Sequence, residues 1–207
     1  TPVKEGYTFA GWYLAETSNN GSGTKVTSTT TVTTAANHTL YAAWTINSYT
    51  LTRSSEDATK GTVAGDSGSI NYGASVTVTA TPATGHTFSG WYNGSTLASS
   101  SASYTFTMPS NNVTLVAKFT ANSYTVKYDG NGATRGSTSS STHTYDVEKE
   151  LTPNGFNRTY TVTFNGNGGT SSSATSTYTF NGWAESATGE KVYADKEVVK
   201  NLTTMAG

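Results

Sequence analysis

Three histidines and a few acidic clusters are the residues of this sequence that could carry acid–base or nucleophilic chemistry. His38, His86 and His143 stand in unrelated contexts, whereas a hydrolytic triad needs serine, histidine and an acid brought together. His86 takes the place that tyrosine holds in a repeated motif, so we expect partly exposed loop or strand histidines. Because the chain has no cysteine and no histidine pair at ligand spacing, we expect no metal site.

The acidic clusters give an equally weak catalytic signal. Glu56-Asp57 and the group Asp146, Glu148 and Glu150 lie in polar, loop-like stretches, which favours a solvated surface over a glycosidase pair. Residues 129–132, Asp-Gly-Asn-Gly, begin like a calcium loop but lack the later ligands, so they predict a turn. The sequence therefore predicts no enzyme, no catalytic residues and no cofactor.

The charge balance excludes other functions. The chain has 12 basic and 13 acidic residues, and neither half carries an excess that could neutralise a phosphate backbone. Nucleic acid is therefore not an expected partner. No stretch approaches the roughly 20 apolar residues of a membrane-spanning helix, so no membrane insertion is expected in this fragment. Aromatics make up 12% of the residues, which argues for folded structure rather than disorder.

Internal repeats organise the chain. Thr-Phe-x-Gly-Trp occurs at residues 8–12, 87–91 and 179–183. A second element, Thr-Leu followed by alternating apolar residues, occurs at 39–45 and 114–120. Each copy of the second element is followed at once by Asn-Ser-Tyr-Thr, and Tyr-Thr-Val-Thr-Phe returns at 160–164. One module thus opens with the Tyr-Thr strand, continues to the tryptophan motif and closes with the second element.

This order predicts three repeats. Residues 1–46 are the C-terminal part of a first repeat, and residues 47–121 are a complete repeat. Residues 122–207 are a third repeat with an inserted strand, lacking its closing strand. The chain is expected to be a piece of a longer protein, and each incomplete repeat could lean on a neighbour or on a second copy. The connections between the repeats are short, which predicts restricted motion and an extended arrangement.

Alternation of apolar and polar residues predicts strands in every repeat. Val113, Leu115, Ala117 and Phe119 share one face of a predicted strand, and Thr, Val or Lys intervene. Residues 146–151 and 195–202 carry weak helical signals only. The predicted fold class is mainly β, built from small tandem modules with little helix.

The aromatics of the repeated motifs are the expected core, because a small module has little else to bury. The glycine before each tryptophan predicts a bulge that turns the indole inward, or else the indole packs on a neighbouring module. Tyr13 and Tyr92 follow the tryptophans, could point outward and are the candidate ligand contacts. The motif-core residues are Phe9, Trp12, Trp44, Phe88, Trp91, Phe119, Phe180 and Trp183.

These motifs resemble the Listeria–Bacteroides repeat, the B-type repeat of internalins, and the middle repeat resembles its divergent branch. Gly-Tyr-Thr-Phe-Ala-Gly-Trp-Tyr at 6–13 and Leu-Tyr-Ala-Ala-Trp at 40–44 carry the resemblance. It implies a small β-grasp-like or β-sandwich-like module of bacterial cell-surface or secreted proteins. The family has no established catalytic residues to carry over.

Two functions remain open at this point. The first is a structural spacer that presents another part of an adhesin-type surface protein, with neighbouring repeats as its partners. The second is a binding module for host glycans or glycoproteins through exposed aromatics. A contiguous exposed aromatic patch would favour the binding module, and scattered aromatics would favour the spacer.

Overall fold

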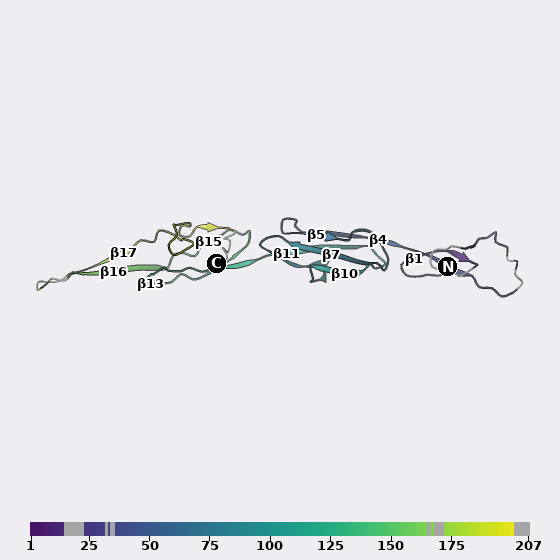
Figure 1. The fold of residues 1–207 in the computed structure, drawn as a ribbon, viewed down its shortest axis with the longest axis horizontal. Helices are drawn as coiled ribbons and strands as arrows, with labels where there is room; N and C mark the ends of the chain where they lie inside the picture. Colours follow the sequence, from purple (N-terminus) through teal and green to yellow (C-terminus); the bar gives the residue numbers. More distant parts are fainter. Residues whose placement is uncertain (15–22, 32, 34–35, 165–166, 168–171, 201–207) are drawn as a thin grey trace. The chain divides into compact units, whose positions relative to one another are not determined.

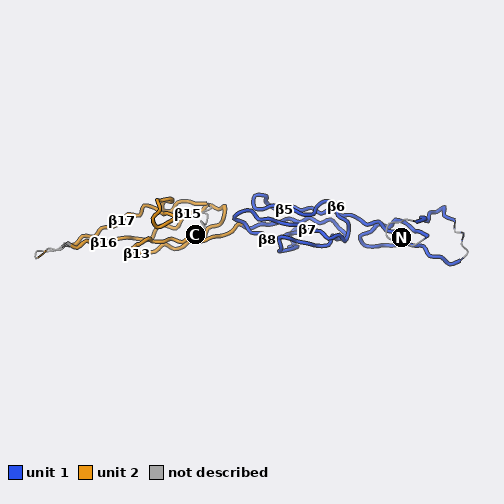
Figure 2. The backbone as a smooth tube through the Cα atoms, in the orientation of Figure 1, with its two compact units in different colours: residues 1–120 blue, residues 121–207 orange. Residues whose placement is uncertain are grey.

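The computed structural model describes residues 1–14, 23–31, 33, 36–164, 167 and 172–200. This part of the chain holds strands β1 to β18 and no helix, which confirms the mainly β fold class. It forms two compact units, residues 1–120 and 121–207, coloured separately in Figure 2. The three repeat boundaries predicted from the sequence stay predictions.

Unit 1 begins with the incomplete repeat, which forms a three-stranded sheet in the order β2-β1-β3. A register shift between Phe9 and Gly11 interrupts the antiparallel pairing of β1 with β3. Such a shift is the signature of a bulge, which the motif glycine predicted. The strands are β1 (Tyr7–Tyr13), β2 (Lys25–Val26) and β3 (Tyr41–Ile46).

The complete repeat of unit 1 forms two sheets (Figure 1). One has five strands in the order β6-β4-β11-β8-β9, and the other has three in the order β10-β7-β5. The strands are β4 (Ser48–Ser55), β5 (Gly61–Gly65), β6 (Gly68–Asn71), β7 (Ser75–Pro82), β8 (His86–Asn93), β9 (Thr96–Ser99), β10 (Ser103–Thr107) and β11 (Val113–Ala121).

The core of this repeat lies between its two sheets. Leu51 and Leu115 come from the five-stranded sheet, and Val76 and Val78 come from the three-stranded one. On β11 the burial alternates strictly, as the sequence pattern predicted, because one face meets the core and the other meets water. A second sheet, rather than a helix, covers the core, so the sandwich-like alternative describes this repeat.

The opening and closing strands of the complete repeat pair with each other. β4 and β11 run parallel, with Val113 opposite Leu51 and Ala117 opposite Ser55. β11 also neighbours β8, which carries the tryptophan motif. The closing strand therefore joins the opening strand to the tryptophan strand within one continuous sheet.

Unit 2 breaks into smaller sheets. Its pairs are β12 with β14 and β15 with β18, and a three-stranded sheet runs β13-β16-β17. The strands are β12 (Ser123–Val126), β13 (Arg135–Gly136), β14 (Ser141–Thr144), β15 (Lys149–Glu150), β16 (Phe156–Phe164), β17 (Ser172–Tyr178) and β18 (Val198–Val199).

The two segments with helical signals in the sequence form strands instead. Lys149 pairs with Val199 and Glu150 with Val198, so each segment contributes a short strand to the same sheet. Val199 and Leu151 are buried beside this pairing, and tertiary burial outweighs the weak helical spacing. Residues 201 and 202 lie outside the described part of the chain. The inserted strand predicted at residues 160–164 forms the C-terminal part of β16.

Candidate functional site

The glycine of each tryptophan motif has the same backbone conformation. The φ angles of Gly11, Gly90 and Gly182 are 137°, 152° and 142°, values that L-residues rarely adopt. A Cβ at Gly90 would collide with Leu97, and a Cβ at Gly182 would lie 2.6 Å from the Lys191 side chain. Glycine is therefore required by conformation and by close packing in this motif.

This conformation brings the motif phenylalanine and tryptophan together. Three residues apart on a regular strand, the two side chains would point to opposite faces. Their rings instead meet edge to face, at centroid distances of 5.4 Å for Phe9–Trp12, 6.0 Å for Phe88–Trp91 and 4.8 Å for Phe180–Trp183. The distorted backbone at the glycine thus turns each indole to the phenylalanine side of the strand.

The expected orientations of Trp12 and Tyr13 are wrong. Trp12 is 40% exposed, whereas the sequence predicted a core residue, and Tyr13 is 8% exposed, whereas the sequence predicted an outward ligand contact. The equivalent Trp91 is fully buried between the two sheets of the complete repeat. Among the described residues 1–46 no second sheet covers Trp12, and Tyr13 lies in the middle strand between Lys25 and Tyr41.

Tyr92 is half-buried and one face of its ring is occupied. The Lys118 ammonium nitrogen lies 4.9 Å from the ring centroid, in cation–π geometry. The same ammonium group lies 3.5 Å from the Glu56 carboxylate. A sugar that stacked on this face would have to displace Lys118. The role of Tyr92 as a ligand contact stays a prediction.

Unit 2 contains a groove of about 1010 Å³. We call it the unit 2 groove and define it by its two walls, residues 124–128 and residues 178–185. Leu151, Phe156 and Tyr193 also line it. The first wall is β12 with its continuation, and the second is the tryptophan motif of the third repeat.

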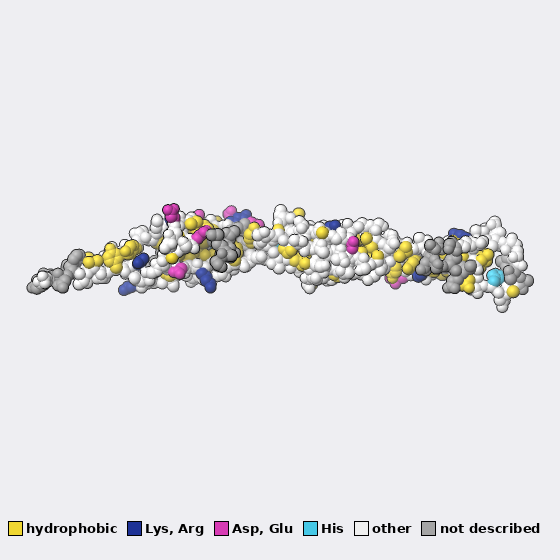
Figure 3. Space-filling view, viewed as in Figure 1, with side chains coloured by type: hydrophobic (Ala, Val, Ile, Leu, Met, Phe, Trp, Pro, Cys, Tyr) yellow, Lys and Arg dark blue, Asp and Glu magenta, His cyan; other side chains and the backbone are white. Residues whose placement is uncertain are grey.

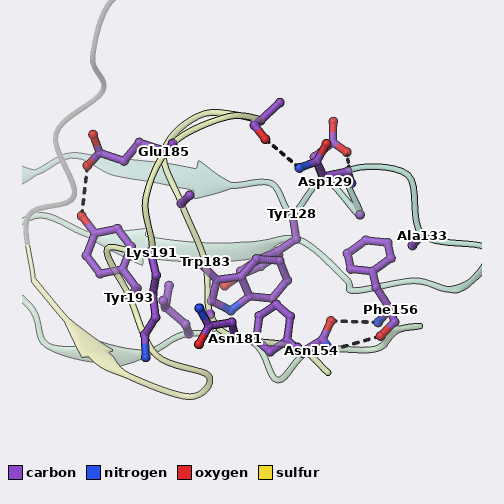
Figure 4. Close-up of a pocket in the computed structure, with 18 of the residues that line it drawn as sticks. Tyr128, Asp129, Ala133, Asn154, Phe156, Asn181, Trp183, Glu185, Lys191 and Tyr193 are labelled. Atoms are coloured by element: carbon purple, nitrogen blue, oxygen red, sulfur yellow. Dashed lines mark hydrogen bonds between the residues drawn. The ribbon is translucent and has the colours of Figure 1, made fainter. Parts of the chain in front are cut away.

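Aromatic rings form the apolar part of the unit 2 groove (Figure 4). The Trp183 ring lies 4.7 Å from Tyr128 and 6.3 Å from Phe156, measured between centroids. Phe180 also contacts Trp183, yet it is 36% exposed, so the prediction of a core position is wrong for Phe180. Its ring lines the groove.

Polar groups on the rim of the groove pair with one another. The Tyr193 hydroxyl donates to Glu185 over 3.3 Å, and the Asn131 amide donates to the Ala187 carbonyl over 2.8 Å (Figure 4). Burial, followed by the nearby negative charge of Glu185, raises the pKa of Tyr193. The groove can therefore bury apolar side chains, but its rim offers no activated nucleophile.

His143, on β14, takes part in a partly buried chain of hydrogen bonds. Its Nε2 atom is 2.9 Å from Ser141 Oγ, which is 2.9 Å from the Tyr128 hydroxyl. The imidazole is 1% exposed, so the expectation of a partly exposed histidine is wrong here. Burial, followed by the positive charge of Lys149, lowers the pKa of His143. Among the described residues Nδ1 has no acceptor, so this pair is not oriented as a triad would require.

The acidic clusters form turns and surface ion pairs. Asp57 accepts from the Thr59 backbone and hydroxyl at 3.0 and 2.6 Å, and these hydrogen bonds lower the pKa of Asp57. Asp129 accepts from the Asn131 amide at 2.8 Å, and Asn131 has a positive φ of 41°, which confirms the predicted turn. No group of three or more potential metal ligands occurs among the described residues.

Sequence reasoning missed an aromatic surface on the hairpin of β16 and β17. Tyr178 is 57% exposed and Tyr160 is also exposed, with their ring centroids 5.5 Å apart. The Arg158 guanidinium lies 5.2 Å from the Tyr178 ring centroid. Figure 3 shows hydrophobic side chains gathered on this hairpin. The alternation of Tyr160 and Val162 was visible in the sequence, but their lack of a covering layer was not.

Family models of known repeats match most of unit 1. Residues 1–43 match the Listeria-Bacteroides repeat domain, and residues 49–123 match the divergent InlB B-repeat domain. Residues 1–43 and 49–123 are therefore repeats of the Listeria–Bacteroides type. The internalin-like B-repeats are those of non-enzymatic surface or secreted proteins of bacteria. The resemblance predicted from the motifs is thereby confirmed.

Two relatives illustrate where such B-repeats occur. Internalin H of Listeria monocytogenes is 38% identical over 122 residues, which cover 58% of this chain and 20% of the relative. A protein of Evansella cellulosilytica with a provisional membrane-protein name is 33% identical over 150 residues, covering 72% of this chain and 20% of the relative. The chain thus spans about a fifth of either relative. No solved structure matches it significantly.

Within the described part of the chain, no helix has the length and apolar character needed to cross a bilayer.

Proposed function

We propose that these B-repeats are structural spacers that present another part of a bacterial cell-surface or secreted protein of the adhesin type. The observation that carries the proposal is the seam between the incomplete and the complete repeat of unit 1. A seam that fixes one repeat on the next lets a row of repeats act as a stiff arm. Non-catalytic surface chemistry and the family relationship support the same function.

Asn47 lies at the centre of this seam. It is the single residue between β3 and β4, so little chain is free to bend there. The Asn47 amide donates to the Gly6 carbonyl over 2.9 Å, and the Asn47 carbonyl accepts from Tyr72 over 2.8 Å. The Thr8 hydroxyl donates to the Asn47 side chain over 2.6 Å. Asn47 therefore forms hydrogen bonds with both repeats.

Aromatic packing also joins the two repeats at the seam. The Tyr7 and Tyr72 rings meet edge to face with centroids 6.1 Å apart. Gly6 is buried with a φ of 72°, and a Cβ there would collide with the Tyr72 ring. A further contact across the seam is a hydrogen bond of 2.9 Å that the Ser110 hydroxyl donates to the Glu5 carboxylate. Rings packed so closely resist hinge motion, because bending would open a cavity.

A binding panel of host-type glycans and mucin-type glycoproteins tests the spacer function against its rival. A spacer predicts no saturable binding by the folded chain, with folding verified by circular dichroism. Saturable binding that a Tyr92→Ala substitution abolishes would contradict the spacer role. A Val3→Ala variant, which changes a fully solvated side chain, serves as the control.

The exposed hairpin aromatics favour a second candidate function, a glycan-binding module. Tyr160 and Tyr178 present neighbouring rings, and Arg158 adds donors that could reach sugar hydroxyls. In the same panel this function predicts binding that is lost in a Tyr160→Ala/Tyr178→Ala variant. Binding that survives the double substitution would exclude the hairpin as the contact.

A further inference from the structure

The hairpin of β16 and β17 has two chemically different faces. Because side chains alternate between the faces of a strand, its cross-strand register decides which of them lie together. One face carries Tyr160 and Tyr178 with Arg158, Val162, Ala174 and Ser176. The other face carries only hydroxyl side chains, namely Thr159, Thr161, Thr163, Ser173, Thr175 and Thr177. We call the first of these the tyrosine face and the second the threonine face.

The two tyrosines of the tyrosine face are diagonal neighbours across the hairpin. Tyr160 lies directly opposite Ser176, two residues before Tyr178. Aromatic side chains can reach each other across such a diagonal, and the small serine leaves the Tyr160 ring room to lean toward Tyr178. The ring centroids are 5.5 Å apart and the ring planes are inclined by 51°. The edges of the two rings are therefore within reach of each other.

Both tyrosine rings are open to small solutes. Tyr160 is 46% exposed and Tyr178 is 57% exposed. The pairing of β13 with β16 involves only Phe156 and Asn157, so beyond them the described hairpin is a ladder of two strands (Figure 1). No third strand of the described sheets therefore flanks Tyr160.

The chain offers few competing targets to an oxidant. Thiols and exposed thioethers are readily oxidised, but the chain has no cysteine and Met108 is fully buried. The other methionine, Met205, lies outside the described residues. One-electron oxidation at the described surface therefore falls on exposed aromatic rings, and Tyr160 and Tyr178 are two such rings in contact.

We propose that Tyr160 and Tyr178 form an oxidative cross-linking site, at which a peroxidase acting with hydrogen peroxide joins the two rings as dityrosine. Each phenol loses one electron and one proton and becomes a phenoxyl radical. The radicals form a carbon–carbon bond between the positions ortho to their oxygens, and the two displaced ring protons move to these oxygens as aromaticity returns. The peroxide accepts the two electrons and two protons and becomes two molecules of water.

The product is a covalent staple across the hairpin. A ladder of two strands is only marginally stable by itself. A bond between Tyr160 and Tyr178 closes the loop between them and removes many of the open conformations of that segment. The cross-linked hairpin should therefore stay paired for longer than the unmodified one. This inference rests on neither of the two functions proposed above.

The test treats the dilute full chain with a peroxidase and hydrogen peroxide, followed by trypsin and mass spectrometry. Trypsin cuts after Arg158 and Lys191, so residues 159–191 form one peptide whose tyrosines are Tyr160 and Tyr178. We expect this peptide to lose the mass of two hydrogen atoms, to stay a single peptide and to show dityrosine fluorescence. An unchanged mass would overturn the proposal. So would two copies of the peptide joined to each other, because the bond would then lie between molecules.

Single substitutions assign the bond to its residues. Tyr160→Phe keeps the ring but removes the O–H group that must be oxidised, so the cross-linked peptide should disappear. Tyr104→Phe is the matched control in the complete repeat, where Tyr104 stacks on Phe106, and it should leave the yield unchanged. A peptide that still loses two hydrogen atoms in Tyr160→Phe would contradict the assignment.

A double substitution tests the geometry of the tyrosine face. Tyr160→Phe combined with Thr161→Tyr keeps the number of tyrosines but moves one phenol to the threonine face. The yield should fall by at least about tenfold, because side chains of that face point away from Tyr178. An equal yield would mean that chain motion, rather than the arrangement of the hairpin, brings the phenols together, and it would overturn the proposal.

Hydrogen exchange tests the effect of the staple. In the cross-linked chain the amide hydrogens of β16 and β17 between the two tyrosines should exchange more slowly by at least about tenfold, because fewer open conformations remain. The amide hydrogens of β11 in the complete repeat serve as the control and should exchange at the same rate before and after oxidation. Unchanged exchange in the cross-linked hairpin would contradict its role as a staple.

Discussion

Single glycines decide the geometry of the tryptophan motif. Gly90→Ala should destabilise the complete repeat by about 2–4 kcal/mol, since it adds backbone strain and a collision with Leu97. Gly73→Ala is the matched control, because Gly73 also has a positive φ but nothing near its Cβ position. That variant should lose only about 1–2 kcal/mol. Thermal unfolding of both variants measures the difference, and equal losses would show that packing at Gly90 contributes nothing.

The buried histidine makes the stability of unit 2 depend on pH. Burial holds the pKa of folded His143 below the ordinary value of 6.5. Below pH 6.5 the unfolded chain therefore binds a proton that the folded chain does not, and stability falls as the pH decreases. Above that pH the contribution is fully present.

Unfolding of unit 2 by urea at pH 5 and pH 7.5 measures this effect. The wild-type chain should be less stable at the lower pH, and His143→Leu should flatten the dependence. His38→Gln removes an imidazole of unit 1 and should leave the dependence of unit 2 in place. An unaltered dependence in His143→Leu would assign it to other groups.

At the residue scale the sequence predicted the backbone bulge of the tryptophan motif. It did not predict how deeply each copy of the motif is buried. Phe, Gly and Trp at fixed spacing predicted the bulge, because only glycine tolerates the φ value found there. Exposure could not be predicted, since Trp12 and Trp91 share one motif and differ only in the layer above them. Likewise, nothing near His143 in the sequence indicated that its side chain would be buried.

Among the strands of the complete repeat, the closing strand β11 supplies the most residues to the buried core cluster. Leu115 is 1% exposed in the middle of β11, and Leu115→Ala should cost about 2–5 kcal/mol through lost burial and a cavity. Thr114→Ala, on the solvent face of the same strand, should change stability by less than about 0.5 kcal/mol. Chemical denaturation monitored by tryptophan fluorescence compares the two variants. Similar losses at both positions would contradict the assigned inner face.

The alternation of apolar and polar residues predicted strand β11 well but predicted the short strands of unit 2 poorly. The faces of β7 and β11 follow from the sequence because both strands have one buried side. The pairing of β15 with β18 was not predictable, since two-residue strands carry no period of their own. The parallel pairing of β4 with β11 was also not predictable, because it joins the two ends of one repeat and no local sequence pattern indicates it.

For the whole molecule, the two units differ in how their strands are joined. The complete repeat of unit 1 has one continuous five-stranded sheet, and the described strands of unit 2 form sheets of two and three strands. Small isolated sheets are marginally stable, so unit 2 should exchange its amide protons faster than β4, β8 and β11. The recurring motifs predict three repeats, and these boundaries stay predictions. The seam at Asn47 could not be predicted from the sequence, because it depends on contacts across 25 or more residues.

The stiffness of the seam in unit 1 is the property on which a spacer function depends most directly. Nitrogen-15 relaxation of the full chain measures it, by comparing the rotational correlation times of residues 1–46 and 47–120. Because Asn47, Tyr7 and Tyr72 tie these repeats together, we predict a common value for both, and a shorter value for residues 1–46 after Tyr72→Ala. A shorter correlation time for residues 1–46 in the unaltered chain would mean a flexible joint and would contradict the spacer function.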